Sequence, residues 1–391
     1  MVFENTGTML VPAEAGVVRL TLGQETRNTG LLVAETNSVF EIGRTNGGTL
    51  LAQAGTVFGG SGIIRLTGGM GCEGTMTVNG TVELAGGDVY MSPGTWTGPG
   101  LLRWLSGSIG DGFTFAPGFH VEMASSGDKS IDGIGTNLGQ VRWMEDSSMS
   151  IRTGGSSAQF INGGLFAQEA GGFWDHLLTF SNRPGGTFLQ ESGTFKVGQF
   201  HNAGTLNVSG GVLNPAFAMN FYSNSTCQFV MGAATPQTNY WFASFGLVKA
   251  VDITLGGKLQ VVVTNGFVPT AGTNYLLIWD GGWGYQINGQ FSQIELPMLS
   301  DNLVWQTAFS PGLVYLQTLQ QVSLTNSTLL PDGSFQFAMN GGSTGTFEIQ
   351  ASTNLVNWQV LTNGALSGPV VFTDLQATNY AHRFYRGVVS P

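Results

Sequence analysis

A phenylalanine and an asparagine two residues later recur along this chain at a fixed step. The pattern stands at Phe160–Asn162, Phe180–Asn182 and Phe200–Asn202, so the same step is taken twice. The same pair opens the chain at Phe3 and Asn5. A looser Asn-Gly or Asn-x-Gly signal, at irregular spacing, marks Asn28, Asn46, Asn79 and Asn137. Self-similarity at a fixed period of this length is the signature of a repeat architecture.

The alternation of a strand explains the motif. Side chains at i and i+2 lie on one side of a strand, so Phe stacks inside a coil while Asn begins the turn, where its side chain tolerates unusual backbone geometry. Repeating the unit at a constant step places each ring on the ring of the next coil. The sequence therefore predicts an all-β chain that forms a parallel β-solenoid (a β-helix). An antiparallel sandwich or a propeller rich in hairpin turns is the alternative.

Composition supports the β prediction and excludes two function classes. Gly supplies 60 of the 391 residues, charged residues only 10%, and no stretch has the composition of a long helix. The net charge is −10, without the basic stripe that a nucleic-acid binder needs. No run of 18 apolar residues occurs, so we expect no membrane-spanning segment.

The rhythm of the repeat divides the chain into three parts. We expect solenoid coils over residues 1–245, the last coils and cap of the solenoid over 246–320, and a small β-sandwich over 321–391. Coils between residues 80 and 140 cannot be phased from the sequence. At about 20 residues per coil and 4.8 Å per step, the solenoid should comprise on the order of 12 coils and 55 Å.

The motifs of the solenoid part occur together in a known group of proteins. The run Phe200–Leu206 has the pattern Phe-x-Asn-x-Gly-Thr-Leu, Leu255–Leu259 has Leu-Gly-Gly-x-Leu, and Gly266–Gly272 has Gly-Phe-x-Pro-x-x-Gly. Over residues 3–320 the chain resembles large Gly-rich secreted bacterial proteins with autotransporter-like β-helical repeats, of the kind found in Verrucomicrobia and Planctomycetes. The resemblance implies secretion or attachment to the bacterial cell surface.

Residues 321–391 show a different pattern. Strand-like runs alternate with turns at 8–12-residue spacing, which is typical of a sandwich. Turns are expected at Asn340, at Asn354 and at Asn363–Gly364. The run Ala351–Trp358, followed by Asp374 and Phe384–Arg386, resembles a fibronectin-III-like module. We expect this module to fold on its own around Trp358.

Cys72 and Cys227 lie far apart in the sequence. In a solenoid roughly seven coils would separate them, on the order of 33 Å, whereas a disulfide allows at most about 7 Å between Cα atoms. No metal-binding spacing such as Cys-x-x-Cys occurs. We therefore expect two buried thiols, no disulfide, no metal and no cofactor.

Catalysis needs clustered groups, and the candidates are few. A polysaccharide hydrolase needs converging carboxylates, and a lyase needs a base and usually Ca²⁺. The adjacent Glu145 and Asp146 point to opposite faces of a strand, or lie in a solvated turn. Residues 128–132 are predicted to form a charged surface loop, and His201 an exposed outward position. Asp175 and His176, beside Trp174, lack a nucleophile nearby, so no site residue is assigned and no enzyme activity is expected.

Tryptophans raise the alternative of sugar binding. Trp96, Trp104 and Trp143 lie in the middle coils, and Trp279 and Trp283 flank a Gly-rich turn. Rows of exposed rings stack on sugars, but packing in the core or cap is the expectation for each. His120 and His382 are scattered and carry no motif.

The sequence thus favours a non-catalytic extracellular protein that is structural or adhesin-like, with the solenoid as a stiff spacer. A carbohydrate-binding or polysaccharide-degrading β-helix, with surface glycans as partners, is the alternative. The outer face of the solenoid decides between them. Because the chain starts in mid-pattern at Phe3, we also expect end-to-end self-association through residues 1–25, into dimers or filaments, and a trimmed or fragmentary N-terminus.

Overall fold

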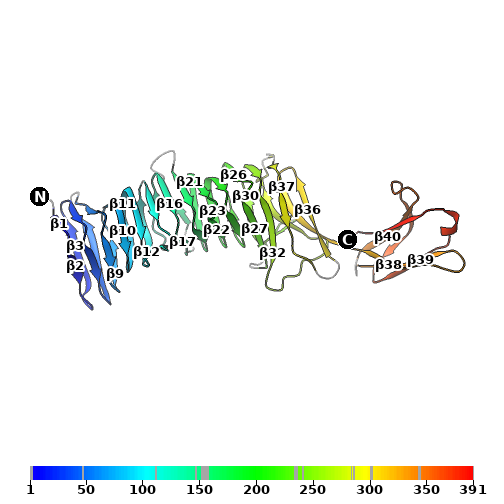
Figure 1. The fold of residues 1–391 in the computed structure, drawn as a ribbon, viewed down its shortest axis with the longest axis horizontal. Helices are drawn as coiled ribbons and strands as arrows, with labels where there is room; N and C mark the ends of the chain where they lie inside the picture. Colours follow the sequence, from blue (N-terminus) through cyan, green and yellow to red (C-terminus); the bar gives the residue numbers. More distant parts are fainter. Residues whose placement is uncertain are drawn as a thin grey trace.

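The computed structural model describes residues 3–45, 48–110, 112–145, 148–150, 158–232, 237–239, 242–282, 284, 287–299, 303–341 and 345–390. Strands stack along the long axis of the molecule, and a smaller group of strands lies beyond one end of the stack (Figure 1). The fold is nearly all β, and the predicted parallel β-solenoid is confirmed. Among the described residues, no helix is long and apolar enough to cross a membrane.

Each coil contributes one strand segment to each of three parallel columns, called here faces A, B and C. Face A comprises β1 (Phe3–Asn5), β4 (Thr26–Asn28), β7 (Leu50–Ala52), the start of β10 (Met70–Val78), the middle of β11 (Thr81–Thr97), the end of β12 (Leu101–Ile109), β15 (Lys129–Ile131), β18 (Ser148–Ser150), the starts of β21 (Gly172–Asn182) and β23 (Thr194–Asn202), β25 (Val212–Leu213), β30 (Leu247–Lys249) and β33 (Asn274–Trp279).

Face B comprises β2 (Thr8–Val11), β5 (Leu31–Ala34), β8 (Val57–Gly59), the ends of β10 and β11, β13 (Phe113–Phe115), β16 (Ile134–Asn137), β19 (Gln159–Asn162), the ends of β21 and β23, β26 (Ala218–Phe221), β31 (Asp252–Leu255) and β34 (Ile287–Gly289).

Face C comprises β3 (Gly16–Leu22), β6 (Ser38–Arg44), β9 (Ile63–Leu66), the starts of β11 and β12, β14 (His120–Met123), β17 (Gln140–Trp143), β20 (Leu165–Gln168), β22 (Thr187–Gln190), β24 (Thr205–Val208), β27 (Thr226–Met231), β32 (Lys258–Val263) and β35 (Gln293–Glu295).

The predicted phenylalanine ladder is confirmed. Phe160, Phe180 and Phe200 are paired in register on face B and buried. Their ring centroids are 5.4 and 5.0 Å apart, with interplanar angles of 20° and 13°. A second stack on face C places Phe166 on Phe188 at 5.3 Å. Parallel, in-register pairing thus repeats one core contact in successive coils.

The predicted asparagine ladder is also confirmed and extends one coil further, to Asn137. Each Nδ2 donates to the Oδ1 of the next asparagine, from Asn137 through Asn162 and Asn182 to Asn202, at 2.8 Å in every step. The Nδ2 groups of Asn137, Asn162 and Asn182 also donate to backbone carbonyls of the next coil at 2.9–3.0 Å. The asparagine column lies at the corner between faces B and C, where its amides provide hydrogen-bond partners for buried polar groups.

The opening motif belongs to a different corner. Phe3 and Asn5 lie on β1 of face A, so they are out of phase with Phe160 and Asn162 on face B, and Phe3 is 51% exposed. Phe3 and Asn5 therefore do not extend the ladders of residues 160–202. The two-residue spacing fits any corner of a triangular coil, and only the pairing register tells the corners apart.

Residues 80–140, which the sequence could not phase, keep the same coil period. Met76 pairs with Trp96, Thr95 with Thr114, and His120 with Gln140. Strand β11 runs through two corners, with register shifts between Leu84 and Asp88. Large buried rings fill this stretch: Trp96, Trp104, Phe113, Phe115 and Phe119.

The last coils end in antiparallel pairing. Strand β33 pairs parallel with β30 and antiparallel with β37 (Leu313–Gln320), which in turn pairs with β36 (Leu303–Ser310). This hairpin lies against the face A edge of the last coil. Cys72 on face A and Cys227 on face C are buried free thiols, as expected, and burial raises the pKa of each.

The C-terminal unit contains two three-stranded antiparallel sheets. One has the order β38 (Ser323–Leu329), β39 (Phe335–Asn340), β42 (Val370–Asp374). The other has the order β41 (Gln359–Ala365), β40 (Thr346–Ser352), β43 (Phe384–Ser390). A 3-10 turn, η1 (Ala377–Asn379), lies between β42 and β43.

Two details of this unit differ from expectation. Its buried centre is Phe337, Met339 and Ile349, with Phe347 and Leu366 beside them. Trp358, just before β41, is half-buried and is not part of that centre. The Arg386 guanidinium lies 4.2 Å from its ring centroid. Asn363 and Gly364 lie inside β41 and do not form a turn, since their backbone pairs with Glu348 and Phe347.

Candidate functional site

The outer side of face C carries a column of alternating charge. In seven successive coils the register stacks Arg19, Glu41, Arg65, Glu83, Arg103, Glu122 and Arg142. We call this column the Arg/Glu ladder. Strand alternation places these side chains outward, because their neighbours along each strand point into the core. The sign of the charge changes at every step.

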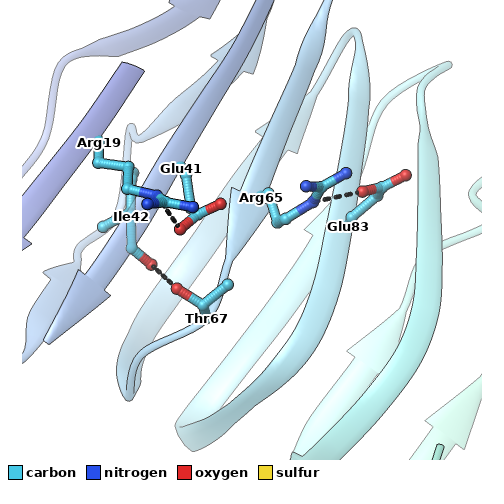
Figure 2. Close-up of polar contacts among 6 residues, drawn as sticks. All are labelled: Arg19, Glu41, Ile42, Arg65, Thr67 and Glu83. Carbon is cyan, nitrogen blue, oxygen red and sulfur yellow. Dashed lines mark hydrogen bonds and ion pairs between the residues drawn. The ribbon is translucent and has the colours of Figure 1, made fainter. Parts of the chain in front are cut away.

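The ladder forms ion pairs between coils. Arg19 Nε lies 2.9 Å from Glu41 Oε1, Arg65 Nε 2.8 Å from Glu83 Oε2, and Arg103 Nε 3.2 Å from Glu122 Oε2. Figure 2 shows the first two pairs side by side on adjacent strands. The Glu83 side chain is only 7% exposed, whereas Arg19 is 71% exposed. The ladder is therefore best shielded from water near Glu83.

Alternation solves a problem that parallel, in-register strands create. Each side chain stands directly over its counterpart in the next coil, so a repeated charge would face itself, which is destabilising. Opposite charges on neighbouring strands instead attract each other. The ladder was not predicted, although Arg and Glu alternate along the chain at steps close to the length of a coil. A search for charges at the coil period was the signal that could have found it.

The ladder ends at Arg142, and an amide chain continues the same column further on. Ala167 and Leu189 occupy the next two positions. Asn207 Nδ2 then donates to Gln228 Oε1 at 2.6 Å, and Gln228 Nε2 donates to Gln260 Oε1 at 2.6 Å. Gln260 Nε2 donates to Glu295 Oε2 at 3.0 Å. Outward polar groups of this column thus bind one another along much of the solenoid.

A shallow hollow of about 230 Å³ lies over the ladder at the corner between faces B and C. His120, Glu122, Gln140 and Arg142 line it together with the turn at Pro99. Its charged groups are those of the ladder, so the hollow contains no separate cluster of carboxylates.

Beyond the ladder, two further carboxylates lie near Arg142. Arg142 donates from Nε and Nη2 to Glu169 at 2.6 and 2.9 Å, and this hydrogen bonding raises the pKa of the Arg142 guanidinium. Burial, followed by the Glu169 charge, raises the pKa of Glu191. The sequence analysis did not single out this pair. Glu169 is held by Arg142, and Glu191 lies beside this pair.

The charged segment at residues 128–132 differs from expectation. Residues Lys129–Ile131 form strand β15 on face A, and Lys129 is 2% exposed rather than lying in a surface loop. Its Nζ donates to the carbonyl oxygens of Ser125 at 2.7 Å and Gly127 at 3.2 Å. The loop carbonyls replace the hydration of the ammonium group, which allows a lysine to occupy an inward strand position.

The other candidates remain apart. Glu145 is exposed, and Asp146 lies outside the described residues. Asp175 and His176 lie on the backbone of β21, and their side chains are outside the description. His201 faces outward but is half-buried, with Nδ1 3.1 Å from Asn220 Nδ2, and burial lowers its pKa. Within the described ranges, no group of three or more His, Cys, Asp or Glu side chains could hold a metal ion.

The tryptophans of the middle coils belong to the core. Trp96, Trp104 and Trp143 are at most 2% exposed, so the expectation of core packing is confirmed for these three. Trp279 is half-buried, with Lys249 Nζ 4.8 Å from its ring centroid. Trp283 lies outside the described residues. The solenoid therefore presents no row of exposed tryptophans within its described part.

We expect the shielded pair Arg65–Glu83 to contribute measurably to stability. Glu83→Ala leaves Arg65 and Arg103 facing each other across the vacant position, and should lower the free energy of unfolding by about 1–3 kcal/mol. The matched control is Glu25→Ala, which breaks the exposed Arg27–Glu25 pair and should cost less than about 1 kcal/mol. Urea denaturation followed by circular dichroism measures both. Equal costs for the two variants would contradict the role of shielding.

Lys129 predicts a pH dependence of stability. Burial lowers the pKa of Lys129 to about 8, against the opposing effect of the Glu145 and Asp128 carboxylates. Between pH 8 and the pKa of the unfolded chain at about 10.5, the unfolded state binds more protons, so stability should rise with pH. Below pH 8 this contribution is constant.

The measurement compares wild type with Lys129→Met from pH 7 to pH 10 by urea denaturation. The wild type should gain stability relative to Lys129→Met as the pH rises from 8 to 10. Lys249→Met, a lysine replacement at a half-exposed position, serves as the control. A constant difference between wild type and Lys129→Met over the whole range would contradict this prediction.

Comparisons with known proteins add little to what the geometry shows. No protein-family model matches the chain, and no curated protein matches it either. Among solved structures, a TibC-catalysed, hyper-glycosylated fragment of TibA is similar, with 14% sequence identity and a TM-score of 0.33. The match covers 76% of this chain and 97% of that fragment. The function proposed below therefore rests on the residues of this chain.

Proposed function

We propose that this chain is a non-catalytic extracellular protein with a structural or adhesive role, in which the solenoid is a stiff spacer. The observation that carries the proposal is the self-paired outer column of face C. Its Arg and Glu side chains bind each other, and its Asn and Gln side chains continue the chain of contacts. Polar groups that bind one another are not available to a substrate, so this surface suits a structural role better than a catalytic one.

Stiffness follows from the pairing pattern. Parallel strands connect each coil to the next on three faces, so bending the rod would stretch hydrogen bonds on at least one of them. Each coil rises about 4.8 Å along one axis, so stacking the coils gives an extended rod. Buried asparagine and phenylalanine columns hold the coils in one register.

The alternative, a polysaccharide-degrading or carbohydrate-binding solenoid, has less support. The described carboxylates of the ladder are paired with arginine rather than converging on a free space, and the middle-coil tryptophans are in the core. Glu169 and Glu191 are the best remaining carboxylate pair.

The test is incubation of the purified chain with a panel of neutral and acidic polysaccharides. We expect no release of reducing ends and no unsaturated products. Product release that is abolished by Glu191→Gln or by Asp175→Asn would overturn the non-catalytic part of the proposal.

The finer relationship proposed is to the Gly-rich secreted proteins of Verrucomicrobia and Planctomycetes that end in a fibronectin-III-like module. Strand order supports the module: first, second and fifth strands share one sheet, and fourth, third and sixth share the other. This order matches a fibronectin-III sandwich without its last strand. Tyr385 on the sixth strand donates its hydroxyl to Asp374 at the end of the fifth, at 2.9 Å. A secreted or cell-surface location is part of the proposal.

End-to-end association through residues 1–25 is proposed as well. Strands β1, β2 and β3 each pair with one strand of the second coil, and exposed apolar side chains lie along them: Phe3, Leu10, Val17 and Val18. Such an edge is a template for strand pairing. Light scattering should show a mass that rises with concentration, and Leu10→Lys with Val17→Lys should keep the chain monomeric. A strict monomer at high concentration in the wild type would refute this part.

A further inference from the structure

A pocket of about 270 Å³ opens on the C-terminal sandwich, away from the solenoid coils. Its walls come from the end of β40, the start of β41 and the segment after η1. It is lined by Ser352, Asn357, Trp358, Gln359, Tyr380 and Arg383, among others. Polar and aromatic side chains from residues 351–359 and from residues 380–383 thus converge here.

Two aromatic rings form the apolar part of the pocket, and both are held in place. The Arg386 guanidinium lies 4.2 Å from the Trp358 ring centroid, and the Arg383 guanidinium lies 4.3 Å from that of Tyr380. Trp358 Nε1 donates to the Leu355 carbonyl oxygen at 3.2 Å. Each ring thus has one face against a cation, and its remaining exposed surface can contact a ligand.

A buried cation supplies the polar part. The Arg383 side chain is 6% exposed, and its Nη1 lies 2.7 Å from Asp374 Oδ2 as an ion pair. At this distance Asp374 balances the charge of the guanidinium and occupies part of its donor capacity. An arginine carries five N–H donors, so a ligand oxygen in the pocket can accept from one that Asp374 does not hold.

Amide groups surround the same space. No hydrogen bond within the described residues occupies the side-chain amides of Asn357 and Gln359, and both residues are exposed at the pocket. An amide both donates and accepts, so two of them can bind adjacent hydroxyl groups. The charge of Arg383 is balanced by Asp374, which favours an uncharged ligand.

We propose that this pocket binds one pyranose ring of a neutral saccharide. The C–H face of the sugar would lie on an aromatic ring, and its hydroxyls would meet the Asn357 and Gln359 amides and the Arg383 guanidinium. The volume lies just below the range of about 300–1,000 Å³ for drug-sized ligands, which suits a single sugar ring. This site goes beyond the spacer role and stands independently of it.

The test uses the full chain and ligand-observed NMR against neutral gluco-, manno- and galacto-oligosaccharides, with uronic-acid oligosaccharides as a second arm. We expect a neutral sugar to bind with a Kd of about 0.1–1 mM. Failure of every sugar at about 10 mM would overturn the proposal. Binding confined to uronic acids would overturn the assignment of a neutral ligand.

Surface variants locate the site without touching the module core. Tyr380→Ala should weaken binding at least about tenfold, and Gln359→Ala about threefold or more. Tyr90→Ala removes a ring that is 55% exposed on the solenoid and should leave the Kd unchanged. Thermal unfolding of each variant checks that the fold is intact. A Kd equal to wild type in folded Tyr380→Ala would place the sugar elsewhere and refute the site.

Discussion

Replacing Phe180 with Ala should destabilise the solenoid by about 3–5 kcal/mol, the cost of truncating a fully buried phenylalanine. Phe180 lies between Phe160 and Phe200 in the face B stack, and its ring also meets Phe188 and Phe195 edge-on at 5.2 and 5.4 Å. The stacked coils are held apart by their own backbone pairing, so the cavity cannot collapse easily.

Urea denaturation with the matched variant Phe217→Ala measures this cost. Phe217 is 55% exposed in the turn before β26 and its truncation should change stability by less than about 0.5 kcal/mol. A loss below about 1 kcal/mol for Phe180→Ala would mean that the ladder does not bear on stability.

The second large effect is expected for Asn182→Ala, at about 2–4 kcal/mol. Asn182 accepts from Asn162 and donates to Asn202 and to the Thr205 carbonyl oxygen, at 2.8, 2.8 and 2.9 Å. Removing the amide takes one donor from the Asn202 and Thr205 oxygens and one acceptor from Asn162, and each buried group left unsatisfied costs about 1–3 kcal/mol.

An outward asparagine of the same region provides the control. Asn220, whose Nδ2 lies 3.1 Å from His201 Nδ1, is half-exposed and water can replace its contact, so Asn220→Ala should cost about 0.5–1 kcal/mol. Equal losses for Asn182→Ala and Asn220→Ala in urea denaturation would show that the buried column contributes no more than a surface contact.

The local repeat was sufficient to predict the β-solenoid and the two ladders at residues 160–202. A Phe and an Asn two positions apart, returned at a constant step, stack on identical residues in successive coils. The separation of Cys72 and Cys227 followed from the same geometry. The second stack, of Phe166 on Phe188, shares no such motif and was not predicted.

Register decided what the spacing could not. Corner turns of unequal length change the step from coil to coil, so Arg19, Glu41 and Arg65 fall into one column only when the strands are paired. For the same reason Phe3 belongs to a different corner from Phe160. An average period therefore does not predict which residues share a column. Hydrogen bonding between strands pairs each residue with one partner in the next coil, and so defines the column.

Tertiary packing also decided the environment of single side chains. The loop carbonyls of Ser125 and Gly127 allow Lys129 to point inward, although its charge predicts a surface position. Arg386 holds Trp358 at the rim of a pocket rather than in the core of the sandwich. In both cases a specific neighbour replaces water around a polar or aromatic group: the loop just before Lys129 in the first, and Arg386 on another strand in the second. The sequence pattern does not record which neighbour that is.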